Sequence, residues 1–205
     1  MWKNAGAQVL LCAGFALLLS TLAAQPTPGD NKIYNNSYQP NDDILKNETT
    51  LKLSDDFYLE ILPEMELLSG VLSQTSWNNN YERMACDSLY YRNLKQFFSN
   101  YKNHEAMQIA EYLTSIGFAY NAPPSFINFL SYPTFNAKYE YNDILIERAK
   151  GKENLEKFRL SLKKLAEESN FTSFYKDNIS TYKNLLETFN KDLKAKTFTN
   201  WHNNF

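Results

Sequence analysis

The stretch "NHEAMQIAEY", residues 103–112, contains residue types that hydrolytic zinc chemistry uses. A zincin helix needs two histidines four residues apart, so that both imidazoles reach one metal ion, and a glutamate beside the first to polarise the bound water. His104 and Glu105 match the first half of this pattern, but Gln108 stands where the second histidine is needed, and an amide is a poor zinc ligand. The other histidine, His202, lies in an Asn-rich tail. We therefore expect no metal ligand here and interpret His104 as a helix N-terminal residue or as a hydrogen-bonding residue between helices.

Searches for other catalytic patterns give no candidate. The sequence has no G-x-S-x-G elbow, no C-x-x-C pair and no carboxylate pair that stands out from ordinary surface charge. Cys86 is interpreted as a small buried apolar residue, because no histidine partner is indicated for it. We predict no catalytic, cofactor-binding or metal-binding residue in this chain.

The N-terminus predicts export. Lys3 precedes the apolar run "AQVLLCAGFALLLSTLAA", which ends in small residues before "QPTPGD". This pattern is typical of a secretory signal, here residues 1–24, with cleavage after Ala23 or Ala24. The alternative, a retained membrane anchor, is disfavoured because the apolar core is short for a bilayer crossing. We expect a periplasmic or secreted protein without a membrane span once the signal is removed.

Charge and composition limit the partners and the architecture. A formal net charge of −2 offers no basic surface for a phosphate backbone, so nucleic acid is not an expected partner. The 43% hydrophobic content is enough for one domain with a real core. Residues 25–50 contain three prolines and many asparagines, which predicts a flexible leader. In "LKLSDDFYLEIL", residues 51–62, apolar residues alternate on both sides of a polar "SDD", which predicts a short hairpin.

From Pro63 onward, apolar residues recur at helical spacing. Pro63 followed by Glu64 and Glu66 is typical of a helix start, with one apolar face formed by Met65, Leu68, Val71 and Leu72. Further helices are predicted from Tyr90 to Tyr101, over 104–116 with Gly117 as a left-handed cap, near 126–130, over 152–167 and from Ile179 to Leu193. We therefore expect a mainly α fold, a multi-helix single domain over residues 51–205 with a short N-terminal β-hairpin.

Four segments carry a family resemblance: "PEMELLSGVLSQTSW", "YYRNLKQFFSNYKNHEAMQIAEYL", "GFAYNAPPSFINFLSYP" and "LKKLAEESNFTSFYKDNISTYKN". The chain resembles an exported bacterial family catalogued as domain of unknown function 4932. The resemblance rests on the order of an "ELLS"-like helix start, a "FF..YK.H" segment and a "NF..FY" segment before a Tyr-bearing helix. In that family these helices precede a zincin-like H-E-x-x-H helix, so the resemblance implies a secreted zinc-dependent peptidase or a relative of one. This chain has no such motif, and no catalytic residue is carried over.

Two explanations fit the missing motif. On the first, these residues are the N-terminal part of a longer metallopeptidase-like protein, whose longer form would bind zinc and act on a peptide or protein substrate. Loop residues Trp77, Tyr120 and Asn121 would then line one wall of the substrate cleft. On the second, the chain is a peptide-binding, glycan-binding or structural module of the envelope, without chemistry of its own.

Overall fold

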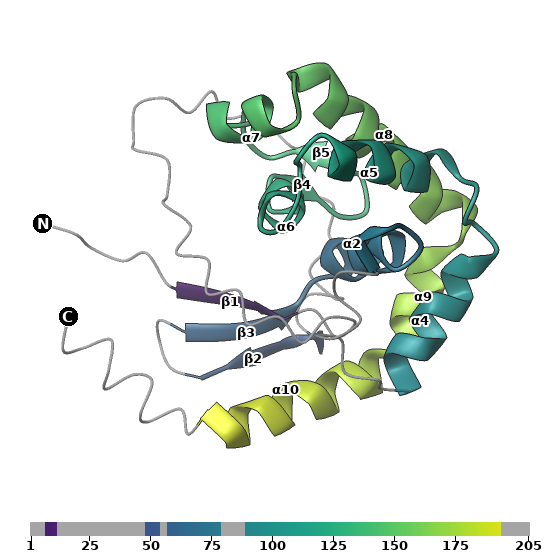
Figure 1. Ribbon diagram of the computed structural model, residues 1–205. Helices are drawn as coiled ribbons and strands as arrows, with labels where there is room; N and C mark the ends of the chain where they lie inside the picture. Colours follow the sequence, from purple (N-terminus) through teal and green to yellow (C-terminus); the bar gives the residue numbers. More distant parts are fainter. Residues whose placement is uncertain (1–6, 12–47, 54–56, 79–88, 194–205) are drawn as a thin grey trace, which may run out of the picture.

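The computed structural model describes residues 7–11, 48–53, 57–78 and 89–193 (Figure 1). The fold is mainly helical with a short antiparallel hairpin at its N-terminal side, which confirms the fold class expected from the sequence. The small sheet, the central helix α2 and a shell of further helices share one hydrophobic core. None of the helices in these residues combines the length and the apolar character that a bilayer crossing requires.

The predicted hairpin is present. β2 (Thr50–Lys52) pairs antiparallel with β3 (Phe57–Ile61), with Leu51 opposite Leu59. Thr49, just before β2, is buried, and its carbonyl accepts the backbone N–H of Ile61 at 3.0 Å. These contacts place Thr49 and Thr50 against β3, within the segment that the sequence predicts to be a flexible leader.

A third strand lies within the predicted signal segment. β1 (Ala7–Leu11) runs parallel to β3 and gives the sheet the order β1-β3-β2. Ile61 donates toward β2, and neighbouring residues in a strand point their backbone groups to opposite sides, so Tyr58 and Glu60 turn theirs toward β1. The apolar signal pattern of this segment does not predict a strand. Unpaired backbone groups at a strand edge attract any extended apolar segment, which is the physical reason for the pairing.

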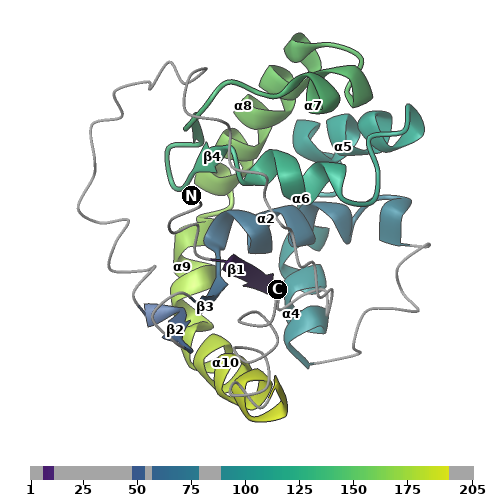
Figure 2. The same cartoon turned by 90° about the vertical axis from the view of Figure 1, so that its left-hand side faces the viewer.

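Helix α2 (Pro63–Leu72) is the centre of the fold. Pro63 stands in its first turn, as predicted, and Figures 1 and 2 place the helix between the sheet and helices α5 and α6. All its residues are buried, including Glu64 and Glu66, so the prediction of a single apolar face is wrong for this helix. A Cβ on Gly70 would lie 2.1 Å from Cε2 of Phe98, so the buried ring of Phe98 on α4 packs directly on this glycine and leaves no room for a side chain.

The remaining elements surround α2. They are α4 (Leu89–Ser99), α5 (Glu105–Ser115), α6 (Ala122–Ile127), β4 (Leu130–Ser131), β5 (Asn136–Ala137), α7 (Asp143–Arg148), α8 (Lys152–Glu168), α9 (Phe171–Asp177) and α10 (Ile179–Leu193). Helix α8 crosses α5 and contacts α9, while α10 lies at the other side of the sheet from α2, beside β2 and β3 (Figure 1). Gly117 has φ 96°, which confirms it as the left-handed residue after α5. Helices α7 and α9 and the β4–β5 pair are not among the elements predicted from the sequence.

Candidate functional site

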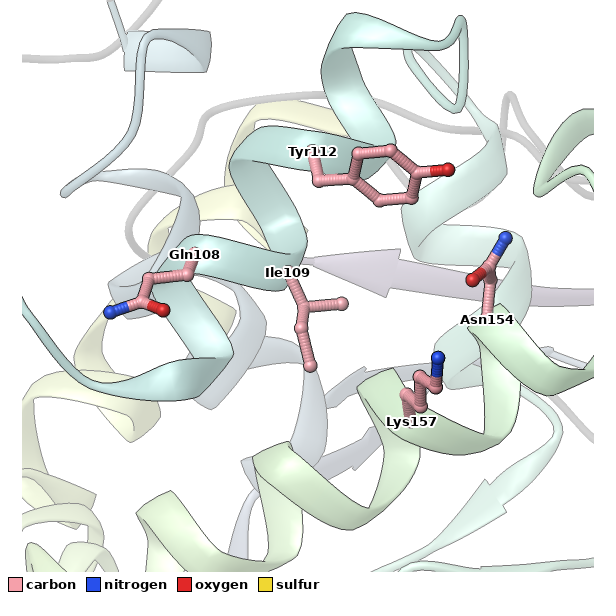
Figure 3. Close-up of a pocket in the computed structure, with 5 residues that line it drawn as sticks. All are labelled: Gln108, Ile109, Tyr112, Asn154 and Lys157. Atoms are coloured by element: carbon pink, nitrogen blue, oxygen red, sulfur yellow. The ribbon is translucent and has the colours of Figure 1, made fainter.

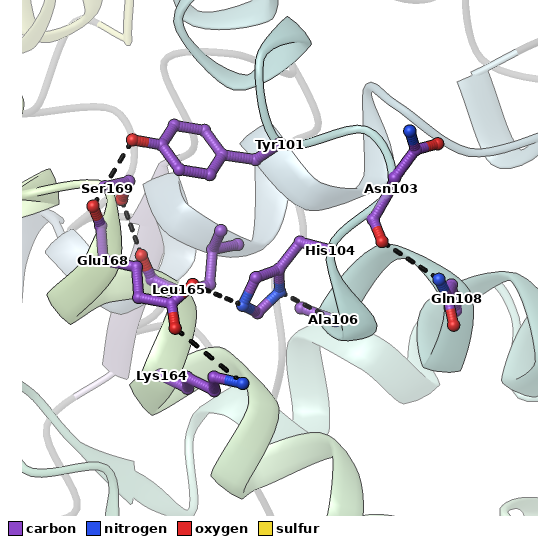
Figure 4. Close-up of polar contacts among 9 residues, drawn as sticks. All are labelled: Tyr101, Asn103, His104, Ala106, Gln108, Lys164, Leu165, Glu168 and Ser169. Carbon is purple, nitrogen blue, oxygen red and sulfur yellow. Dashed lines mark hydrogen bonds and ion pairs between the residues drawn. The ribbon is translucent and has the colours of Figure 1, made fainter.

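His104 caps helix α5. Its backbone is extended and its Nδ1 accepts the backbone N–H of Ala106 at 3.0 Å (Figure 4). Nε2 lies 3.4 Å from Oε2 of Glu168 on α8, an ion-pair distance without the geometry of a hydrogen bond. The interpretation of His104 as a helix N-terminal residue is confirmed, whereas the alternative, a hydrogen bond between helices, is not formed. Because Nδ1 is an acceptor, the neutral ring carries its proton on Nε2, on the side of Glu168.

The environment of His104 favours the neutral imidazole. Burial lowers the pKa of His104 below its usual 6.5, and Lys164 adds to this effect, whereas the carboxylates of Glu168 and Glu105 oppose it. Protonation would also put a hydrogen on Nδ1 and remove the cap of α5. The charge would then stand at a helix N-terminus, where the helix dipole disfavours cations.

Stability is expected to fall as the pH drops below about 6.5. The pKa of His104 is lower in the folded protein than in the unfolded chain, so the unfolded chain takes up the proton first as the pH falls. The contribution of neutral His104 to stability is therefore present above pH 6.5 and is lost as the pH falls below that value. Urea unfolding between pH 7.5 and 5.0 measures this slope. His104→Asn keeps a capping oxygen and removes the titration, so the variant should show a flatter profile. A wild type that becomes more stable toward pH 5 would show that the pairing of imidazolium with Glu168 dominates.

Buried carboxylates form a second polar cluster. Glu66 is 0% exposed, and the hydroxyl of Tyr90 donates to its Oε2 at 2.5 Å. The hydroxyls of Tyr90 and Tyr182 are 2.8 Å apart, which joins α2, α4 and α10. Burial and, after it, the charge of Glu66 raise the pKa of Tyr90 far above its usual range, so this phenol stays a donor. The cluster is enclosed by the core, and we interpret it as a group of contacts that stabilises the fold.

Two further contacts extend the polar groups around α2. The hydroxyl of Tyr175 on α9 donates to the carbonyl of Ile61 at 2.6 Å, and its oxygen lies 3.0 Å from Oγ1 of Thr49, whose hydroxyl can donate to it. Nζ of Lys138 lies 3.9 Å from Oε1 of Glu64. Sequence reasoning treated Glu64 and Glu66 as ordinary first-turn charges. Their place within the nearly continuous apolar run "LEILPEMELLSGVL" is the signal that could have indicated buried acids.

An open groove lies between α5 and α8. Its volume is about 320 Å³, and Figure 3 shows the five side chains that line it: Gln108, Ile109, Tyr112, Asn154 and Lys157. None of these five residues is among the site residues predicted from the sequence. Three of them share one face of α5 at positions i, i+1 and i+4, but only the crossing of α5 and α8 brings the other two beside them.

The residues predicted to line a cleft lie outside this groove. Trp77 is 5% exposed and belongs to the core. Tyr120 is 76% exposed with φ 57°, and Oδ1 of the neighbouring Asn121 accepts from Nη1 of Arg148 at 2.7 Å. Burial leaves Trp77 little surface for a ligand, whereas Tyr120 and Asn121 stand at the surface. Their role in a cleft stays a prediction.

Among residues 48–53, 57–78 and 89–193, no three His, Cys, Asp or Glu side chains come together in a way that could hold a metal ion. Cys86 and His202 lie outside the described residues. Within the described part of the chain, His104 is used as a helix cap and the buried glutamates as core hydrogen-bonding groups.

The fold and these contacts define a mainly helical domain built around one buried helix, with a small three-stranded sheet on one side. The family model described as "Domain of unknown function (DUF4932)" matches residues 58–205, more than half of the chain. The chain belongs to this family. No curated protein and no solved structure matches it.

Proposed function

We propose that this chain is the helical, non-hydrolytic part of an exported protein related to zinc-dependent peptidases. The observation that supports this proposal most directly is the use of His104. A metal ion at Nδ1 would displace the N–H of Ala106 and undo the cap of α5, and Nε2 is packed against α8. Gln108, four residues on, donates its amide to the carbonyl of Asn103. His104 and Gln108, the two positions of the zincin-like spacing, therefore both have local structural roles.

In this proposal the domain supports a site for a peptide or protein substrate whose metal-bearing wall lies elsewhere. The buried polar contacts suit such a support, since Tyr90, Tyr175 and Tyr182 tie the helices to α2 and to the end of β3. Fully satisfied buried networks make a core rigid and unique. Rigid elements are what a substrate-binding wall requires.

Zinc analysis combined with a peptidase assay tests the missing catalysis. We expect the purified chain to hold far less than one zinc per molecule and to leave unstructured peptide substrates intact. His104→Asn is a matched variant, because asparagine preserves the helix cap. Stoichiometric zinc in the wild type that disappears in His104→Asn would overturn the proposal, since it would make His104 a ligand.

Export is the second part of the proposal, and it is tested by the N-terminus of the protein recovered from the periplasm or the medium. We expect it to follow Ala23 or Ala24. Cleavage there would remove β1 and leave β3 paired with β2 alone, while the helices around α2 keep their contacts. Recovery of the full-length chain from the cytoplasm, with Met1 and β1 retained, would contradict export.

A peptide-binding or glycan-binding module remains the second candidate. The groove between α5 and α8 favours it, because it brings an exposed aromatic ring, an ammonium group and two carboxamides together at the surface. Such a mixture of apolar and polar groups is typical of small-ligand sites. A module of this kind would bind without metal or catalysis.

A further inference from the structure

Lys157 lines the groove between α5 and α8 and has no carboxylate partner among the described residues. Its ammonium group points into the space between α5 and α8 (Figure 3). The cations that follow it on α8 each form an ion pair on the same helix: Arg159 with Glu156, Lys163 with Glu167 and Lys164 with Glu168. An unpaired ammonium beside an apolar surface attracts an anionic ligand.

The two carboxamides of the groove are oriented as hydrogen-bond acceptors. Nδ2 of Asn154 donates to the carbonyl of Ala149 at 2.8 Å, and Nε2 of Gln108 donates to the carbonyl of Asn103 at 2.9 Å. Both amide nitrogens are thereby held by the protein's own backbone. In Figure 3 the oxygen of Asn154 points toward the space between α5 and α8, and that of Gln108 lies at the outer end of the groove. They would accept N–H or O–H groups from a ligand.

The apolar part of the groove comes from α5. Ile109 lies between Gln108 and Tyr112, and Tyr112 is 49% exposed. An exposed tyrosine ring beside an aliphatic side chain offers a flat apolar surface with a polar tip. A ligand that fills the groove therefore needs an apolar group next to its anionic group.

We propose that the groove between α5 and α8 binds the C-terminal end of a peptide. The terminal carboxylate would pair with Lys157, backbone N–H groups would donate to Asn154 and Gln108, and an apolar last side chain would cover Ile109 and Tyr112. Acidic sugars carry a carboxylate but no comparable apolar side chain, and neutral glycans leave Lys157 unused. A volume of about 320 Å³ suits the terminal residues of a peptide and not a long segment. This site requires neither the relation to peptidases nor export.

The test is a titration of the purified, isotope-labelled chain, followed by amide NMR. The probe is N-acetyl-Leu-Phe with a free carboxylate, and the control is the same dipeptide with a C-terminal amide. We expect amide chemical-shift changes concentrated in residues 105–115 and 152–160. The amide should bind about three- to fivefold more weakly than the acid, because one partly exposed ion pair contributes little free energy. Equal affinity for acid and amide, or shifts elsewhere on the protein, would overturn the proposal.

Matched lysine variants separate the site from general charge. Lys157→Gln should weaken binding of the acid by about three- to fivefold and leave that of the amide unchanged, while Lys157→Arg should retain preference for the acid. Lys152→Gln is the control, because it changes the net charge equally. Lys152 is exposed on the same helix and does not line the groove. An equal loss in Lys152→Gln would overturn the assignment. Glucuronic acid that binds as tightly as the dipeptide would overturn the peptide preference.

Discussion

Replacing Phe158 by alanine is expected to lower the free energy of unfolding by about 3–5 kcal/mol. The ring of Phe158 on α8 is 1% exposed and stacks on Phe126 of α6, with the ring centroids 5.5 Å apart and the planes at 17°. Phe126 in turn contacts Phe118 and Tyr141, so Phe158 packs against the central ring of an aromatic cluster. Removal leaves a cavity lined by rigid rings, which cannot collapse easily. Urea unfolding followed by circular dichroism measures the loss.

Leu160→Ala is the matched control for this prediction. It removes a large apolar side chain from the same helix, but Leu160 is 54% exposed, so its loss should change the free energy of unfolding by less than about 0.5 kcal/mol. A Phe158→Ala variant as stable as Leu160→Ala would mean that α8 is not packed on α6. Such a result would also remove the support for the groove, since α8 provides Asn154 and Lys157.

Long helices with periodic apolar residues can be predicted from the sequence. In α8, Leu155, Phe158, Leu162 and Leu165 recur at spacings of three and four, and all are buried. The short helices α7 and α9 span less than two full turns of apolar pattern, so periodicity alone does not reveal them. The β4–β5 pair depends on Phe135, whose φ of 54° is uncommon for a non-glycine residue and carries no sequence signal.

The candidate sites also differ in how far the local sequence predicts them. The capping role of His104 was predictable because it depends on the residues that follow it directly in the chain. The contacts of Glu66 with Tyr90 and of Tyr90 with Tyr182 join positions 24 and 92 residues apart. Only the tertiary packing brings these groups together, and the same holds for the groove. Roles that depend on neighbouring residues can therefore be predicted from the sequence, whereas sites formed by distant segments cannot.

Tyr90→Phe is expected to lower the free energy of unfolding by about 2–3 kcal/mol, because Glu66 loses a short hydrogen bond inside the core and Tyr182 loses its hydroxyl partner. Burial holds the pKa of Tyr90 far above its usual range, so the effect should be the same from pH 6 to pH 9. Urea unfolding of wild type and variant across this range checks both statements.

A double-mutant cycle shows whether the three groups act as one unit. If the hydroxyl of Tyr182 stabilises the protein mainly through Tyr90, the loss in Tyr90→Phe with Tyr182→Phe should be clearly smaller than the sum of the two single losses. Tyr112→Phe is the surface control, since that phenol is half exposed and its removal should cost less than about 0.5 kcal/mol. A cost for Tyr90→Phe no larger than this control would mean that the Glu66 carboxyl does not depend on the phenol. The rigid attachment of α4 and α10 to α2, on which the proposed supporting role rests, would then lose its physical basis.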